Sequence, residues 1–234
     1  MASPLMLVFL TALPGVLCCQ SSFIDLESKG SNKSSIRFLV LGDWGGLPYP
    51  PYITPIEKAT ARMMAKTASQ MGADFILALG DNFYYKGVTD VNDPRFQVTF
   101  EDVYTQDSLN IPWYVIAGNH DHAGNVLAQI EYSQKSKRCC ARNFPYYYYE
   151  MNFRIPQNGQ HSDHHHAGHG GCCVETSDDF LDQQPKAPRS GVQANRQLLW
   201  LRNAWAMSKA DYLLVAWPLS GMVHILRMGQ PTVY

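Results

Sequence analysis

The strongest constraint on the fold is an arrangement that occurs three times: a short apolar run followed at once by glycine and a polar side chain. The runs span residues 36–41, 75–79 and 113–117. Short uninterrupted apolar runs predict strands that are covered on both faces, as in parallel sheets. Between the first two, residues 55–71 carry apolar side chains at helical spacing, and Thr54-Pro55 is a typical helix start. This strand-helix-strand order predicts an α/β fold.

Each predicted strand ends in a polar signature: Gly42-Asp43-Trp44-Gly45, Gly80-Asp81-Asn82-Phe83-Tyr84 and Gly118-Asn119-His120-Asp121-His122. The carboxyl ends of parallel strands meet at one edge of a sheet, and glycine lets the chain turn sharply there. Carboxylate, amide and imidazole groups bind hard or borderline metals. A single Gly-Asp is usually an ordinary turn, but three signatures in series favour a metal site. Two metal ions would hold a phosphate ester and lower the pKa of a bound water.

Residues 35–138 resemble the tartrate-resistant purple acid phosphatases, a family within the calcineurin-like metallophosphoesterases. The wider superfamily usually has Asp-x-His in the first signature, whereas Asp43-Trp44-Gly45 contains no histidine. Instead, Tyr84 follows Asp81 by three positions, which is the purple acid phosphatase pattern. The resemblance implies an α/β/β/α sandwich, here incomplete on its C-terminal side.

The resemblance also implies roles for five residues. Asp43 and Tyr84 would bind a ferric ion, and Asp81 would bridge it to a second divalent metal, iron or zinc. Asn119 would bind that second ion through its amide oxygen. His120 would contact the phosphate or protonate the leaving group. The implied activity is acid hydrolysis of phosphate monoesters, with small monoesters or phosphoproteins as substrates.

Other interpretations of these residues are less well supported. Tyr84 could be a packed aromatic beside Tyr85, but its spacing from Asp81 favours the ligand. Asp121 and His122 are interpreted as supporting residues. A related phosphodiesterase or nuclease is disfavoured by Tyr84 and by the absence of Asp-x-His.

The second half of the chain departs from the family pattern. The family carries histidines in a Gly-His-Tyr-Pro segment and in a later Gly-His-x-His, and neither is present. After a predicted strand at 212–216, the chain instead continues as Trp217-Pro218-Leu219-Ser220. Gly-His-Tyr-Pro codons read one base out of frame can encode these four residues. A His-rich run at 160–171 becomes a family-like strand after the same kind of shift, which suggests frameshifts. Sequencing the transcript tests this hypothesis.

Two hypotheses about function follow from these departures. The first is an acid phosphatase whose turnover is weak or absent because histidine ligands are missing. The second is a non-enzymatic secreted product that retains partial metal binding. The His-rich run could itself be a metal-binding loop, which we consider the weaker interpretation.

The remaining sequence predicts one secreted domain. Residues 1–20 are interpreted as a signal peptide, 35–216 as a partial metallophosphoesterase domain, and 217–234 as an aberrant tail. The net charge of -1 and the pI near 6.7 argue against nucleic-acid or membrane partners.

The expected location is secreted or lysosomal, and the expected state is a monomeric glycoprotein with a sequon at Asn32. The cysteines occur only as adjacent doublets, and disulfides between the later doublets remain open. A helix is expected at residues 193–207.

Overall fold

A computed structural model describes residues 35–136, 143–153, 166–168, 191–207, 212–216 and 223–227. The interpreted signal peptide, the sequon at Asn32, the cysteine doublets and residues 217–220 lie outside this part of the chain.

The first layer is a three-stranded parallel sheet in the order β1-β2-β3, with bounds β1 (Phe38–Leu41), β2 (Phe75–Leu79) and β3 (Trp113–Ile116). Phe38 pairs with Phe75, and Ile76 pairs with Trp113. The three predicted strands are therefore confirmed. β1 begins later than expected because the backbone N–H of Arg37 donates to the Asp74 carboxylate instead of to a neighbouring strand.

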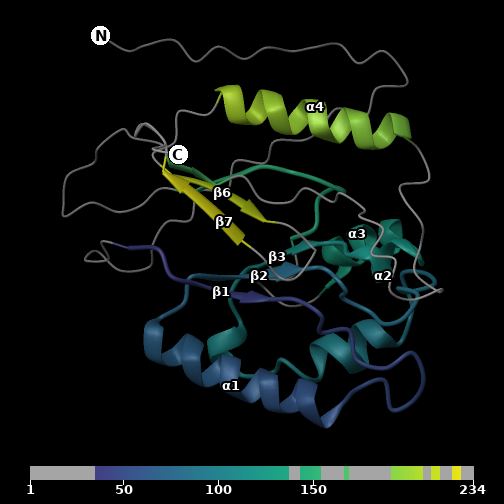
Figure 1. Cartoon of the computed structure of the whole chain (residues 1–234). Helices are drawn as coiled ribbons and strands as arrows, with labels where there is room; N and C mark the ends of the chain where they lie inside the picture. Colours follow the sequence, from purple (N-terminus) through teal and green to yellow (C-terminus); the bar gives the residue numbers. More distant parts are fainter. Residues whose placement is uncertain are drawn as a thin grey trace.

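Helix α1 (Pro55–Met71) has the bounds that the sequence predicts. Thr54 and Glu57 form a reciprocal capping box at its start, and Gly72 ends it in the left-handed conformation with φ 64°. Three small side chains, Ala61, Ala65 and Ala68, are buried on one face of the helix. Small side chains let the helix approach its neighbours closely, and Figure 1 shows α1 below the parallel sheet.

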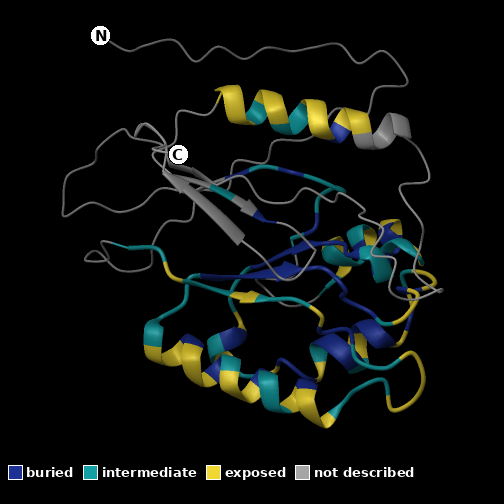
Figure 2. Cartoon of the chain, viewed as in Figure 1, coloured by how far each residue is buried: buried dark blue, intermediate teal, exposed yellow. Residues whose placement is uncertain are grey.

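An aromatic cluster fills the core beneath β3. A π-helical turn at Phe96–Glu101 and a 3-10 turn at Asp107–Leu109 connect β2 to β3. The Trp44 ring lies 5.8 Å from that of Phe100 and 5.7 Å from that of Tyr104, and Trp113 packs against all three. Figure 2 shows this buried layer along the strands and the turns below them. Trp44 lies within the first signature, next to Asp43, so the cluster fixes the loop that leaves β1.

Two further helices, α2 (Asn119–His122) and α3 (Val126–Lys135), lie beside the parallel sheet on the right of Figure 1. The remaining elements are β4 (Met151–Phe153), β5 (His166–Gly168), α4 (Gly191–Met207), β6 (Tyr212–Ala216) and β7 (Val223–Arg227). β4 pairs with β5 and β6 pairs with β7, both antiparallel. In Figure 1, β6 and β7 lie between the parallel sheet and α4. The layers thus follow the expected α/β/β/α order.

Three upper elements differ from the sequence predictions. α4 begins at Gly191, two residues before the predicted helix, while β6 has the predicted bounds. β5 lies inside the His-rich run, and β7 lies inside the 217–234 segment interpreted as a tail. The helices within the described ranges are all too short or too polar to span a bilayer.

Candidate metal centre

Two of the strand-end aspartates adopt a backbone conformation that non-glycine residues rarely use. Asp43 has φ 54° and Asp81 has φ 50°, both left-handed. Such conformations cost free energy and persist only where the surrounding structure imposes them, often at functional sites. Here each one turns the chain off its strand, so that the aspartate side chains reach the same tyrosine at one sheet edge.

Three oxygen donors converge at this edge. The Tyr84 hydroxyl donates to Asp43 Oδ1 at 2.9 Å and lies 3.5 Å from Asp81 Oδ2. The Tyr84 backbone N–H donates to the Gly45 carbonyl at 3.2 Å, which ties the second signature to the first. Asp43 is exposed, Tyr84 half-buried and Asp81 buried. The arrangement is thus a set of oxygen ligands that is open to solvent on one side.

The third signature reaches the same place through α2. The His120 backbone N–H donates to Asp81 Oδ1 at 3.1 Å, and the His120 ring lies 4.6 Å from the Tyr84 ring. His120 Nδ1 lies 2.7 Å from the Tyr85 carbonyl oxygen. A carbonyl can only accept, so Nδ1 carries a proton and Nε2 is the second ring nitrogen available for chemistry. Asn119 is half-buried at the first position of α2, next to His120.

A buried network beneath the site fixes the loops. Asp121 is fully buried, and its carboxylate accepts from the backbone N–H groups of Asn82 and Gly118 and from Gln129 Nε2. The Asn82 side chain donates to Gln129 and accepts from Trp44 Nε1. All three signatures therefore share one hydrogen-bonded support.

The sequence indicated a supporting role for Asp121 but missed Asn82 and Gln129. Asn82 lies inside the second signature, in which Asp81 and Tyr84 are the predicted ligands. Gln129 lies in α3, where a single glutamine gives no local signal of its partner.

The electrostatics of the site favour a bound cation. Burial, together with the nearby Asp121 carboxylate, raises the pKa of Asp81 to about 6, although the His120 backbone N–H opposes the shift. Burial and the carboxylates of Asp81 and Asp43 raise the pKa of Tyr84. Burial is the larger cause of both shifts and the neighbouring carboxylates add to it, so a cation among these groups would oppose both shifts.

The donor set fits a hard metal ion in part. The oxygens of Asp43, Asp81 and Tyr84 suit a hard cation, and carboxylate can bridge two ions. Over the described ranges, no group of three or more His, Cys, Asp and Glu side chains is placed to hold a metal. Of the four candidate ligands, only Asp43 and Asp81 belong to these residue types, and the others are the Tyr84 phenol and the Asn119 amide.

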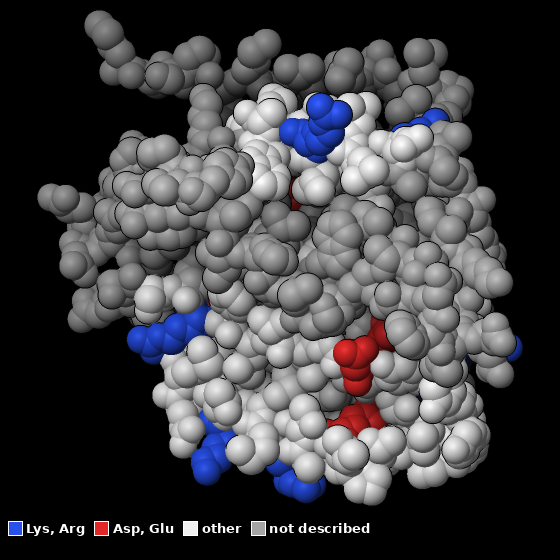
Figure 3. Space-filling view, viewed as in Figure 1, with Lys and Arg blue, Asp and Glu red and all other residues white. Residues whose placement is uncertain are grey.

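Asp43 exposes its carboxylate at the sheet edge, where the Asp81 carboxylate is buried. On the face shown in Figure 3, described acidic side chains gather in one area, and described basic side chains are scattered around it. Carboxylates repel a phosphate ester, so phosphate binding at Asp43 and Asp81 requires positive charge from bound cations.

Comparison with known proteins places this geometry in context. A model of the calcineurin-like phosphoesterase family matches residues 36–224, well beyond the 35–138 segment that carries the motif resemblance. The tartrate-resistant acid phosphatase type 5 of Homo sapiens is 51% identical over 183 residues, which is 78% of this chain and 55% of that protein. Purple acid phosphatase 4 of Arabidopsis thaliana is 39% identical over 115 residues, covering 47% of this chain and 32% of that protein.

A solved structure shares the fold. It is described as GAP50, the anchor in the inner membrane complex of Plasmodium, and it matches with a TM-score of 0.60 at 24% identity over 77% of this chain and 54% of that one. The chain spans about half the length of the mammalian relative described above. Because the family model covers most of the sequence, the chain belongs to the calcineurin-like phosphoesterase family.

Proposed function

We propose that this chain is an acid phosphatase that hydrolyses phosphate monoesters, including those on phosphoproteins, at a dinuclear metal centre. The observation that carries the proposal is the convergence of Asp43, Asp81 and the Tyr84 hydroxyl at one sheet edge. The names of the relatives, tartrate-resistant and purple acid phosphatases, support the same activity.

The four candidate ligands divide between two ions. Asp43 and Tyr84 would hold a ferric ion, Asp81 would contribute to both ions, and Asn119 would hold a second divalent ion, iron or zinc. When bound, the metal pair supplies positive charge to the phosphate and a water of lowered pKa. The shared hydrogen bond between Tyr84 and Asp43 keeps both oxygens close to the positions that a common ligand requires.

His120 is the proposed general acid. Its Nδ1 proton is held by the Tyr85 carbonyl, so Nε2 is the atom that carries or releases a proton toward the leaving-group oxygen. The adjacent Tyr84 ring limits how the imidazole turns. Donation from Nε2 requires both ring nitrogens to carry a proton, because Nδ1 already holds the proton of the neutral ring.

The turnover of this chain is proposed to be weak. Trp217-Pro218-Leu219-Ser220 replaces the family's Gly-His-Tyr-Pro, so the histidine that this segment brings is missing. This substitution favours a second candidate function, a non-enzymatic secreted product that retains partial metal binding. In either case the chain is proposed to enter the secretory pathway through residues 1–20 and to act as a secreted or lysosomal monomeric glycoprotein.

One experiment separates these functions. The purified 234-residue chain is supplied with ferric citrate and zinc, and visible absorption and acid hydrolysis of p-nitrophenyl phosphate are measured. The proposal expects a tyrosinate-to-iron absorption band with slow, metal-dependent hydrolysis. The band and the hydrolysis should both disappear in Tyr84→Phe and persist in Tyr85→Phe, which alters an exposed neighbour.

Other results have equally clear meanings. A band without any hydrolysis supports the non-enzymatic product. A colourless, inert chain whose Tyr84→Phe variant behaves identically contradicts the metal centre.

A further inference from the structure

The structure buries an ion pair outside the candidate ligand set. Arg95 Nη2 lies 2.8 Å from Asp93 Oδ2, and the two side chains are 8% and 5% exposed. Removing two charges from water is costly, and a buried pair seldom repays that cost by itself. The contacts that surround the pair indicate what it does.

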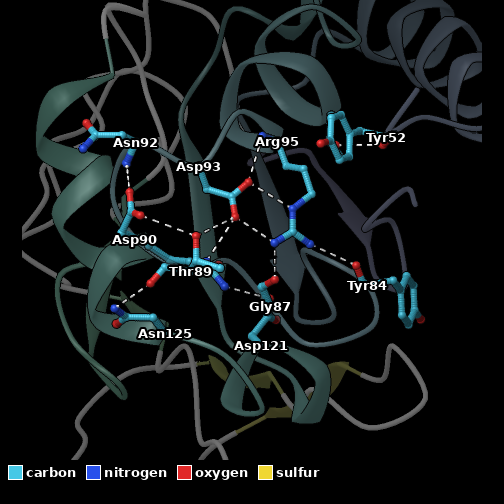
Figure 4. A network of polar contacts seen from close by, with 12 residues as sticks. Tyr52, Tyr84, Gly87, Thr89, Asp90, Asn92, Asp93, Arg95, Asp121 and Asn125 are labelled. Carbon is cyan, nitrogen blue, oxygen red and sulfur yellow. Dashed lines mark hydrogen bonds and ion pairs between the residues drawn. The ribbon is translucent and has the colours of Figure 1, made fainter. Parts of the chain in front are cut away.

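Arg95 uses its planar fork on two kinds of partner. Nε and Nη2 donate to the two oxygens of Asp93 at 3.0 and 2.8 Å. Nη1 donates to the Tyr84 carbonyl at 3.1 Å, and Nη2 also donates to the Gly87 carbonyl. One guanidinium therefore connects the Asp93 carboxylate to the first and last residues of the segment 84–87, Tyr84 and Gly87 (Figure 4).

Asp93 fixes the orientation of that guanidinium. Its carboxylate also accepts from the backbone N–H groups of Thr89 and of Arg95 itself, at 3.1 and 3.0 Å. Burial acts to raise the pKa of Asp93, but the hydrogen bonds from Arg95 and Thr89 outweigh it and hold the pKa below its usual range. Asp93 is thus a charged anchor that holds both the Arg95 guanidinium and the Thr89 backbone N–H.

The held segment has little freedom to relax. The Gly87 backbone N–H donates to the Phe83 carbonyl, which closes a turn across Tyr84. Gly87 has φ 57°, and a Cβ at this position would lie 2.8 Å from the Asp121 carbonyl oxygen. Because the Tyr84 N–H is bound to Gly45, both polar groups of the Tyr84 backbone are fixed.

We propose that Arg95, oriented by Asp93, is a positioning residue that fixes the Tyr84 phenol at the candidate metal centre. The juxtaposition rests on contacts within the chain, and only its consequence for iron rests on the proposed function. Lysine cannot replace this arginine because an ammonium lacks the planar fork that reaches one carboxylate and two carbonyls together.

The test first reads Tyr84 without metal. The full chain is labelled with 3-fluorotyrosine, and Tyr84→Phe assigns the Tyr84 fluorine resonance among the 13 tyrosines. In Arg95→Met and Arg95→Lys, the resonance should move toward its position in the urea-unfolded chain. Arg37→Met is the matched control, because Arg37 also donates to a backbone carbonyl, that of Met71, away from the site. It should leave the Tyr84 resonance unchanged.

Iron affinity gives the second readout. Titration with ferric citrate should show about 10–100-fold weaker binding in the Arg95 variants and no change in Arg37→Met. An unshifted Tyr84 resonance in a folded Arg95→Lys overturns the proposal, and this variant decides the matter where Arg95→Met does not fold. If the Tyr84 resonance shifts in the Arg95 variants but the parent chain binds no iron, the positioning role is upheld and the proposed function is rejected.

Discussion

At the residue scale, the Asp121 carboxylate is central because it joins loops from different strands. It lies fully buried and accepts from two backbone N–H groups and from Gln129. Buried donors that lose their acceptor each cost roughly 1–3 kcal/mol. The three signatures are therefore held together by a side chain that need not touch a metal or a substrate.

Replacing Asp121 with asparagine should destabilise the fold strongly. The new amide NH₂ would face donors where the carboxylate now accepts, so we expect a loss of about 3 kcal/mol in the free energy of unfolding. Urea unfolding followed by tryptophan fluorescence measures it. Asp107→Asn, at an exposed position, is the matched control and should change stability by less than about 0.5 kcal/mol. Equal effects of the two substitutions would contradict the role of the network.

Position 118 requires glycine because there is no space for a side chain, and not because of its backbone angles. Its φ of -95° is accessible to any residue, yet a Cβ would lie 2.2 Å from Asp81 Oδ1 and 2.5 Å from the Asp81 backbone N. Gly118→Ala should therefore displace Asp81 and remove the iron-dependent absorption band.

The matched control for Gly118→Ala is Gly72→Ala at the end of α1, where the added Cβ meets only Arg37 at 3.8 Å. That variant strains a left-handed glycine and should lower stability, but it should keep the band. Retention of the band by Gly118→Ala would show that Asp81 is not confined as the structure indicates.

At the element scale, local signals explain which elements the sequence predicted. The bounds of α1 are marked by Thr54 and Pro55 at one end and by Gly72 at the other, and β2 is a continuous apolar run. β5 consists of His166, Ala167 and Gly168, which show no strand pattern, and it pairs with β4 across an intervening segment. β7 has a strand-like run from Val223 to Leu226 and pairs with the preceding strand β6, but it follows the point where the family pattern breaks at Trp217.

The start of α1 also contains a pH-sensitive contact. Glu57 is 5% exposed, its Oε2 accepts from the Thr54 backbone N–H, and its Oε1 has no hydrogen-bond partner among the described residues. Burial, opposed by the Thr54 hydrogen bond, raises the pKa of Glu57 to about 7. The folded state therefore favours the protonated acid, and the stability gained by protonation is lost as pH rises from about 4.5 through 7.

Glu57→Gln should remove that loss. Glutamine stays neutral and can accept the same hydrogen bond in a capping box. We expect the variant to match the parent near pH 4.5 and to be more stable by up to about 3 kcal/mol above pH 7. Unfolding midpoints measured across this pH range check it, with Glu131→Gln on the exposed face of α3 as the control. A parent whose stability is flat between pH 4.5 and 7 would contradict the raised pKa.

At the scale of the whole molecule, the sequence predicted which side chains meet at the sheet edge better than it predicted the contacts that support them. The convergence of Asp43, Asp81 and Tyr84 follows from a general rule, because parallel strands bring their carboxyl ends to one edge. Arg95, by contrast, binds backbone carbonyls, which every residue possesses. No pattern of side-chain types marks such a contact, so only the folded chain identifies it.

Metal binding should stabilise the whole domain, since the candidate ligands come from the ends of three different strands. A ligand that binds only the folded state, at a concentration 100 times its Kd, adds about 2.7 kcal/mol to the free energy of unfolding. For a chain of this size, that corresponds to a rise of about 5–10 °C in Tm. Thermal unfolding with ferric citrate, before and after chelation, measures the rise.

Chelation should reverse the rise in the parent chain, and Tyr84→Phe should show little rise at all. This comparison separates ligation at the sheet edge from binding elsewhere, such as at the His-rich run of residues 160–171. If Tyr84→Phe gains as much thermal stability from iron as the parent, the stabilising ion is bound at another place. A replacement of His164, His165 and His166 by alanine would then be expected to abolish the rise that Tyr84→Phe leaves intact.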